Sequence, residues 1–299
     1  MSGLGALSDL GGESSVNTLR TISEMRATSR AARQGGKRLG LVPTMGALHE
    51  GHLSLVRAAR AQCDVVAASI FVNPTQFGPS EDFEKYPRAL ERDCALLERE
   101  SVDLVFAPSV EEMYPAGAVT WVAVEGLSER LCGRSRPGHF RGVTTVVAKL
   151  FHMVEPDAAF FGQKDAAQCT ILRKMVRDLD MGVEIVVCPI VREADGLAMS
   201  SRNAYLSPAE RASATVLYRA LGRVQARWEK GERHSARLID AAQRIFLEEP
   251  EVRLDYVEIV DNDTLEPVAD VARGALVAVA AHVGPARLID NLILPTAKG

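Results

Sequence analysis

The 299-residue chain lacks the features that mark membrane, secreted or nucleic-acid-binding proteins. No stretch approaches the roughly 20 consecutive apolar residues that a membrane-spanning helix needs. Residues 1–16 contain no Lys or Arg and no apolar core, unlike a secretory signal. The 35 basic residues nearly balance the 39 acidic ones, so no broad basic surface is expected. We therefore expect a cytoplasmic protein with a flexible tail at 1–16 that binds neither nucleic acid nor membranes.

Cysteine is scarce, and its spacing excludes the common cysteine-based sites. The chain has an odd number of cysteines and no Cys-x-x-Cys pair that would indicate a structural zinc or redox site. They are Cys63, Cys94, Cys132, Cys169 and Cys188. Free, buried thiols in a reducing compartment are the expected state. The hydrophobic fraction of 47% with 25% charged residues is typical of a soluble globular protein with a full core.

The first two thirds of the chain alternate between two kinds of hydrophobic pattern. Short apolar runs, typical of buried strands, occupy 39–42, 65–72, 104–107, 158–161 and 183–188. Helical spacing occupies about 51–62, 90–97, 143–154 and 171–179. This alternation predicts an α/β fold with a mostly parallel sheet covered by helices on both faces.

The pattern changes after Pro189, where helices are followed by strands. The segment Ser207-Pro208-Ala209-Glu210 combines an N-cap, a proline at the first helical position and a capping-box glutamate, and it predicts the start of a long helix. A second helix at 238–246 and strands at 254–260, 275–283 and 287–294 follow. We place a domain boundary near residue 190, which gives a first domain at 17–190 and a smaller α+β domain at 191–299.

Polar residues directly follow the first predicted strand, in the segment Met45-Gly46-Ala47-Leu48-His49-Glu50-Gly51-His52. Ligands of open parallel sheets bind beyond the carboxyl ends of strands, where helix N-termini attract phosphate. Both His49 and His52 can face that point and donate hydrogen bonds to phosphate oxygens. A pair of metal ligands or two structural histidines are the alternatives. No third zinc ligand is evident, and the spacing is one residue shorter than in the zinc helix His-Glu-x-x-His.

Three more polar clusters follow later strands. Asn73 and Gln76 are neutral amides suited to orienting a carboxylate, although an ordinary Asn-Pro turn is the better explanation of this segment when it is taken alone. The segment 162–165 and Gln168 offer an ammonium, a carboxylate and another amide, although surface Lys-Asp pairs are common. The hydroxyls and guanidinium of Met199-Ser200-Ser201-Arg202 can clamp a pyrophosphate, and the preceding Asp195-Gly196 predicts a turn that lets this loop move.

The four clusters converge on one predicted sheet edge, which single coincidences would not produce. They predict a nucleotide-phosphate site beside a pocket of neutral amides. The chain lacks both the Gly-x-x-x-x-Gly-Lys-Ser/Thr loop and the Gly-x-Gly-x-x-Gly fingerprint, which argues against P-loop and dinucleotide-binding proteins.

Taken together, these motifs resemble those of the pantothenate synthetase family. The resemblance rests on 42–52 with its His-x-Gly-His signature, 71–74, Gln76-Phe77, Phe161-Gly162, Lys164-Asp165 and 199–203, and it extends from about residue 17 over nearly the whole chain. The family is similar to the wider nucleotidylyltransferase group, which carries related His-x-Gly-His and Lys-Met-Ser-Lys-Ser signatures.

The resemblance implies an ATP-dependent ligase that joins (R)-pantoate to β-alanine. Pantoate would first attack ATP to give pantoyl adenylate and pyrophosphate, and β-alanine would then displace AMP. The resemblance also implies Mg²⁺ with the nucleotide, a Rossmann-like first domain, a C-terminal lid and a homodimer.

The resemblance further assigns roles to individual residues. The catalytic residues would be His52, the expected proton donor, with His49, Lys164 and Arg202. ATP would contact Met45, Gly46, Ala47, Leu48, His49, Glu50, Gly51, His52, Gly162, Gln163, Lys164, Asp165, Val191, Met199, Ser200, Ser201 and Arg202. Pantoate would be held by Gln76 and Gln168, with Asn73 at the border of its pocket. No protein metal ligand is expected.

Three residues depart from the family pattern. Gln163 stands where a glutamate is usual, Ala166 where an aromatic is usual, and Thr75 where a methionine is common. We expect activity to survive, with a slightly altered nucleotide affinity from the first change and looser helix packing from the second. The competing hypotheses are another nucleotidylyltransferase, a nucleotide sensor without turnover, and a histidine-based metallohydrolase.

Overall fold

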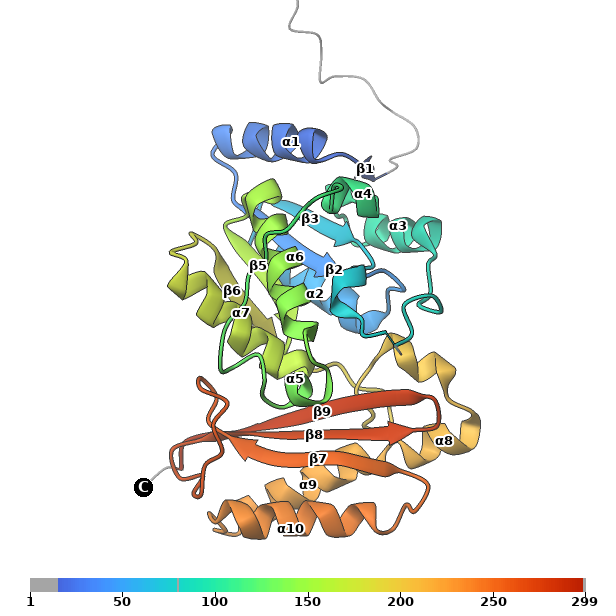
Figure 1. Cartoon of the computed structure of the whole chain (residues 1–299), viewed down its shortest axis with the longest axis vertical. Coiled ribbons are helices and arrows are strands. Elements are labelled where there is room, and N and C mark those ends of the chain that lie inside the picture. Colours follow the sequence, from blue (N-terminus) through green and yellow to red (C-terminus); the bar gives the residue numbers. More distant parts are fainter. Residues whose placement is uncertain (1–15, 80, 298–299) are drawn as a thin grey trace, which may run out of the picture.

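The computed structural model describes residues 16–79 and 81–297, which form two stacked units (Figure 1). The upper unit is built on a six-stranded sheet and the lower one on a three-stranded sheet. Among the described residues, no helix is long and apolar enough to cross a membrane. Of the predicted tail at 1–16, residues 1–15 lie outside the described part of the chain.

Every pairing in the six-stranded sheet is parallel. In spatial order its strands are β1 (Asn17–Leu19), β4 (Leu104–Phe106), β3 (Val65–Ile70), β2 (Leu39–Thr44), β5 (Ala158–Gly162) and β6 (Glu184–Cys188). After β2, the chain adds β3 and β4 on one side of this strand, and it later adds β5 and β6 on the other side. The connections after β2 and β5 therefore diverge at this topological switch point, where open α/β sheets bind ligands.

Helices cover both faces of this sheet because β2 and β3 are apolar on both faces. One face packs on α1 (Ile22–Gln34), α6 (His139–Val154) and α7 (Ala166–Asp178), and the other on α2 (Glu50–Arg60) and α3 (Leu90–Arg99). Along β2, Leu39 and Leu41 enter the first core, whereas Val42 enters the second. The alternation of side chains along a strand thus separates two cores.

Short helical segments complete the upper unit. They are α4 (Val110–Met113), α5 (Cys132–Ser135) and the 3₁₀ helices η1 (Pro74–Gln76) and η2 (Gln163–Asp165).

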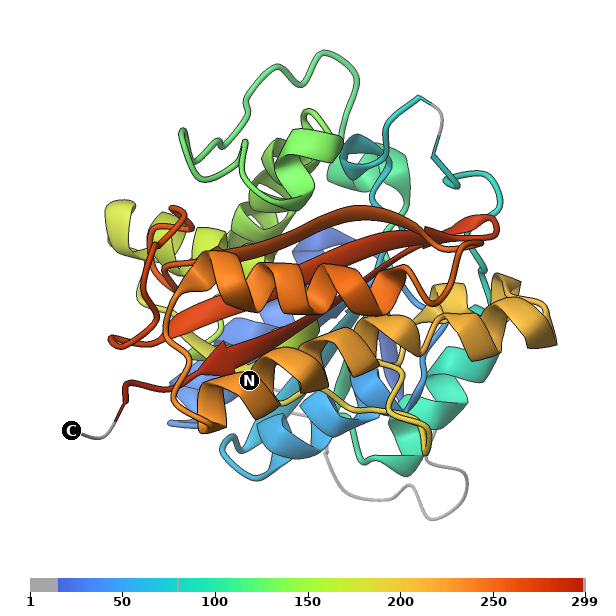
Figure 2. The same ribbon diagram turned by 90° about the horizontal axis from the view of Figure 1, so that it is seen from below.

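The lower unit is an antiparallel sheet of β7 (Arg253–Val260), β8 (Ala275–Val283) and β9 (Ala286–Leu294). Figure 2 shows α9 (Val216–Glu229) and α10 (Ser235–Phe246) lying across its outer face, and α8 (Pro208–Ser213) precedes them. The 3₁₀ helix η3 (Ser201–Tyr205) leads into this unit. On the inner face, Tyr256, Leu276 and Ala278 share a hydrophobic core with the upper unit.

The predicted fold class is confirmed, namely a parallel α/β sheet followed by a smaller antiparallel unit. The prediction of one long helix after Ser207 is wrong, because α8 ends at Ser213 and α9 begins at Val216. At the junction the Thr215 amide bonds to the carbonyl three residues back, and its hydroxyl bonds to the same Ala212 carbonyl. Such tight turns and side-chain bonds to the backbone interrupt a helix.

All five cysteines are free, as expected, and Cys94 is half-buried whereas the other four are buried. Gly142 on α6 lies directly against the backbone of η1. A Cβ atom there would lie 2.3 Å from the Thr75 carbonyl oxygen and 2.7 Å from the Gln76 amide nitrogen. Glycine at this position therefore sets how close η1 lies to α6.

Gly142→Ala should destabilise the protein by about 1–3 kcal/mol, because the added methyl group collides with backbone rather than with a movable side chain. Gly222→Ala is the matched control, since Gly222 also lies inside a helix and its Cβ would meet no atom within 4 Å. It should stabilise by about 0.5–1 kcal/mol. Urea unfolding of both variants measures the two changes in the free energy of unfolding. Equal changes would contradict the role assigned to Gly142.

Candidate active site

A tight turn joins β2 to α2 and starts the site. Gly46 and Ala47 both have positive φ angles, 80° and 51°. The carboxylate of Asp93, fully buried on α3, accepts the backbone N–H groups of Ala47 at 2.8 Å and Leu48 at 2.9 Å. A Cβ on Gly46 would lie 3.0 Å from that carboxylate. The carboxylate therefore replaces the hydrogen bonds that this strained turn cannot make within itself.

The two histidines of the next segment cap α2. The Gly51 amide donates to Nδ1 of His49 at 3.1 Å, and the His49 amide donates to Nδ1 of His52 at 3.4 Å. A Cβ on Gly51 would lie 2.8 Å from the His49 ring, so the glycine between them allows this packing. Because both Nδ1 atoms accept, each neutral imidazole carries its proton on Nε2.

Both imidazoles are neutral near pH 7. Burial, followed by the positive charge of Lys164, lowers the pKa of His49 to about 4. Burial, followed by His49 and Lys164, lowers the pKa of His52 to about 3. The site thus presents two uncharged Nε2–H donors beside an ammonium group.

Gln76 on η1 is held by its neighbours. Its Oε1 accepts from Nδ2 of Asn73 at 3.0 Å, and its Nε2 lies 3.1 Å from the Met45 sulfur. The Asn73 amide also donates to the Gly142 carbonyl and accepts from Thr75 and Tyr114, and this side chain is buried. Asn73 therefore borders the cavity mainly as the residue that positions Gln76.

After β5, the lower sheet clamps the segment that carries Lys164. Nδ2 of Asn291 on β9 donates to the carbonyls of Gln163 at 2.8 Å and Lys164 at 2.9 Å, and its Oδ1 accepts from the Gln163 side chain. Beside it, Arg192 donates to both carboxylate oxygens of the buried Asp290. This Asn291 clamp fixes the backbone of the 162–165 segment.

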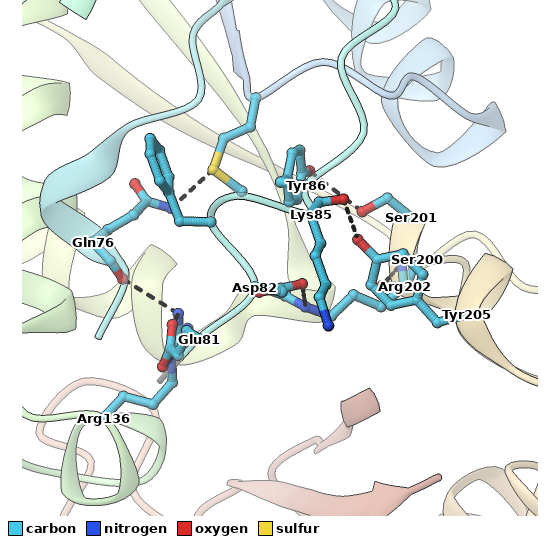
Figure 3. A network of polar contacts seen from close by, with 12 residues as sticks. Gln76, Glu81, Asp82, Lys85, Tyr86, Arg136, Ser200, Ser201, Arg202 and Tyr205 are labelled. Atoms are coloured by element: carbon cyan, nitrogen blue, oxygen red, sulfur yellow. Dashed lines mark hydrogen bonds and ion pairs between the residues drawn. The ribbon is translucent and has the colours of Figure 1, made fainter. Parts of the chain in front are cut away.

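The segment from Ser200 to Arg202 faces residues 81–88, which we call the strap (Figure 3). Arg202 donates to both carboxylate oxygens of Asp82, at 3.1 and 2.8 Å. The hydroxyls of Tyr86 and Ser201 lie 3.3 Å apart. These contacts hold Ser201 and Arg202 at the cavity that Lys164 also lines.

Most residues predicted for the site surround one cavity of about 240 Å³. Its lining includes Met45, His49, Gly51, His52, Asn73, Gln76, Gly162, Lys164, Asp165, Gln168, Val191, Met199, Ser200, Ser201 and Arg202. Five predicted ATP contacts are not among its lining residues: Gly46, Ala47, Leu48, Glu50 and Gln163. The first three form the turn, Glu50 pairs with Arg57, and Gln163 points to Asn291.

Sequence reasoning missed several residues that shape this cavity. Asp93 occupies an apolar position of its helix, between Leu90 and Leu97, and a lone carboxylate on such a face was the available signal. Ser69 lines the cavity with a buried hydroxyl that has no partner. Arg136 also lines it, but its surroundings in the sequence gave no signal.

Among residues 16–79 and 81–297, no group of three or more His, Cys, Asp and Glu side chains is arranged to hold a metal ion.

We expect both site histidines to remain neutral Nε2–H tautomers at pH 6, because their pKa values lie near 4 and 3. ¹⁵N NMR of the imidazoles measures this directly, and imidazolium signals at pH 6 would contradict it. The unfolded chain has histidine pKa values near 6.5 and binds protons first as the pH falls. Because of these two histidines, the free energy of unfolding should fall progressively as the pH drops below 6.5.

Asp93→Asn should destabilise the protein by about 1–3 kcal/mol, since the amide replaces one acceptor by a donor that faces a backbone N–H. Nucleotide binding should weaken with it, because the turn before His49 loses its anchor. Thermal unfolding and ATP titration test this, and an unchanged affinity would show that the turn holds its shape without the carboxylate.

The chain is similar to known proteins of one family. The family model described as pantoate-β-alanine ligase matches residues 17–293. A pantothenate synthetase of Koribacter versatilis is 60% identical, over 94% of this chain and 97% of its own length. One from Acidobacterium capsulatum is 64% identical, over 92% and 95%.

Solved structures give the same result. The pantothenate synthetase of Thermus thermophilus is 51% identical with a TM-score of 0.88, over 93% of this chain and 99% of that one. A pantoate-β-alanine ligase of Francisella tularensis, complexed with β-γ ATP and β-alanine, is 31% identical with a TM-score of 0.77, over 93% and 97%. The chain therefore belongs to the pantoate-β-alanine ligase family, also named pantothenate synthetases.

Proposed function

We propose that this chain joins (R)-pantoate and β-alanine to form pantothenate, with pantoyl adenylate as the intermediate and AMP and pyrophosphate as products. The observation that carries the proposal is that neutral amides and phosphate-binding groups surround one cavity at the switch point of the sheet. A carboxylate substrate and a nucleotide would there meet side by side. Family membership over residues 17–293 supports this over another nucleotidylyltransferase or a sensor.

In the first step, a carboxylate oxygen of pantoate attacks the α-phosphorus of ATP, and pyrophosphate leaves with the electrons of the broken P–O bond. Gln76 and Gln168 would hold pantoate by uncharged donors, which leave its carboxylate nucleophilic. The Nε2–H groups of His49 and His52 would donate to phosphate oxygens as charge builds there. Because these imidazoles are neutral, we assign them hydrogen-bond donation rather than the delivery of a proton from imidazolium.

Lys164 and Arg202, with the hydroxyls of Ser200 and Ser201, would take up the charge of the departing pyrophosphate. To do so, Arg202 must exchange the Asp82 carboxylate for phosphate oxygens. The adenosine would lie along Gly162, Asp165 and Val191, which line the same cavity.

In the second step, the uncharged amine of β-alanine forms a C–N bond to the acyl carbon. The C–O bond to AMP breaks, AMP leaves with that electron pair, and the nitrogen releases a proton to water. A carboxylate is a poor acyl electrophile, so the first step serves to give it a leaving group.

We further propose that Mg²⁺ enters with ATP, held by phosphate oxygens, since the cavity is lined by amides, imidazoles and cations rather than by a carboxylate cluster. Mg²⁺ would neutralise phosphate charge there. A homodimer in the cytoplasm, and a division at residue 190 into a nucleotide domain at 17–190 and a lid at 191–299, complete the proposal. The inner face of β8 and β9 lines the larger cleft beside the cavity, which supports the lid assignment.

The deciding experiment measures pyrophosphate release from Mg-ATP with pantoate alone and then with β-alanine. We expect a single-turnover burst that becomes steady formation of pantothenate when β-alanine is added. Turnover only with a different acceptor would favour another nucleotidylyltransferase, and ATP binding without pyrophosphate release would favour a sensor.

His52→Ala and Lys164→Ala should each slow pyrophosphate release about 100-fold or more, because each removes a donor to the transition-state charge. Gln76→Ala should instead raise the pantoate KM about tenfold through the loss of a hydrogen bond to a charged group. His152→Ala, on the exposed face of α6, is the matched control and should be unchanged. Near-normal turnover of the first two variants would show that His52 and Lys164 do not have the roles assigned to them. An unchanged pantoate KM would show that Gln76 does not bind pantoate.

A further inference from the structure

Among the described residues, three cationic side chains line the inner cavity: Lys164, Arg202 and Arg136. The proposed function uses the first two for the phosphates of ATP. It leaves Arg136 without a role, although a guanidinium so close to the reacting groups must affect which anions bind.

Arg136 holds a carboxylate. Its Nε donates to Oε1 of Glu81 at 2.7 Å and its Nη2 donates to Oε2 at 2.6 Å, and both side chains are largely buried, at 17% and 24% exposed. Two parallel bonds from one edge of the guanidinium are the geometry by which arginine recognises carboxylates. Burial alone would raise the pKa of Glu81, but Arg136 outweighs it and lowers the pKa, so the glutamate is charged.

His139 fixes the orientation of this guanidinium. Its Nδ1 lies 2.8 Å from the Gln76 carbonyl oxygen, so this nitrogen must be the donor. Burial, followed by the charge of Arg136, lowers the pKa of His139 to about 4, so Nε2 is unprotonated near neutral pH and accepts from Nη1 of Arg136 at 3.0 Å. The Nε and Nη2 edge is therefore held toward Glu81 before any ligand binds.

This edge lies where a second substrate must enter. A cleft of about 830 Å³ adjoins the inner cavity, and both are lined by Arg136, His139, Lys164, Asp165, Gln168, Ser200 and Arg202. Nη2 of Arg136 also donates to the Gln76 carbonyl at 3.3 Å. The guanidinium is thus next to the proposed pantoate pocket, at its opening into the cleft.

We propose that Arg136 binds the carboxylate of the amine substrate, and that Glu81 occupies this position until that substrate arrives. The inference rests on the proposed function, in which β-alanine is the acceptor. Its carboxylate survives the reaction and needs a cation, whereas its amine must reach the acyl carbon two methylene groups away. Binding at Arg136 would direct the amine from the cleft toward the inner cavity.

The next residue of the strap, Asp82, also pairs with an arginine that lines the cavity. Asp82 occupies Arg202 just as Glu81 occupies Arg136, and Figure 3 shows the two pairs beside each other. Two adjacent acidic side chains thus satisfy the two guanidinium groups that the substrates need. An amine without a carboxylate offers Arg136 no replacement for Glu81, and separating this pair without a new partner is costly in a partly buried site.

The experiment compares β-alanine with propylamine as acceptors and measures pantoate-dependent ATP–pyrophosphate exchange separately. Arg136→Ala should raise the β-alanine KM about 30-fold through the loss of a bidentate charged pair, a far larger change than in the exchange rate. The preference for β-alanine over propylamine in kcat/KM should fall by a similar factor. Glu81→Gln should lower the β-alanine KM about fivefold, because it removes the competing charge.

Arg134→Ala is the matched control, because Arg134 lies two residues before Arg136 at the end of α5, pairs with Glu258 and lines neither cavity. It should leave the acceptor preference as it is. An unchanged preference in Arg136→Ala, or a raised β-alanine KM in Glu81→Gln, would overturn the proposal, and the glutamine variant decides if Arg136→Ala does not fold. Absence of exchange in the unaltered protein would instead contradict the proposed function itself.

Discussion

The buried carboxylate of Asp93 binds two backbone amides of the turn between β2 and α2, and the site is assembled on that turn. Without it, a left-handed glycine and alanine in succession would leave two amides unpaired inside the protein. Because α2 begins directly after the turn, its position determines where His49 and His52 point. A buried carboxylate of the upper unit thus sets the direction of two neutral imidazoles that line the cavity.

The topology adds the second half of the site. Strands β2 and β5 are neighbours in space, although more than 110 residues separate them in the chain. Their carboxyl ends place the histidines and Lys164 side by side, and the Asn291 clamp from β9 then fixes the lysine segment. Gln163 contributes to that clamp as an amide donor, which gives this departure from the family pattern a structural role.

The local signals in the sequence were sufficient for every strand except β1, for the longer helices other than α1, and for the edge of the sheet that carries the site. They came from apolar periodicity and from polar residues at strand ends, which act over a few residues. Arg136 and His139 were beyond this reasoning, because their roles depend on Gln76, a partner far away in the chain. Asp93 left a signal, a lone carboxylate on an apolar helix face, but its partner Ala47 is also distant in the chain. The break at Thr215 was missed because one hydroxyl bonding to its own helix changes no hydrophobic pattern.

The Asn291 clamp also bears on how the protein is made. A ribosome synthesises β9 after the parallel sheet and after β7 and β8, so a growing chain holds Lys164 on a segment whose carbonyls have no partner from Asn291. The Asn291 clamp is complete only when residue 291 has been added and β9 has paired with β8. The segment that carries Lys164 therefore reaches its final geometry only after the last strand of the lower sheet has been made.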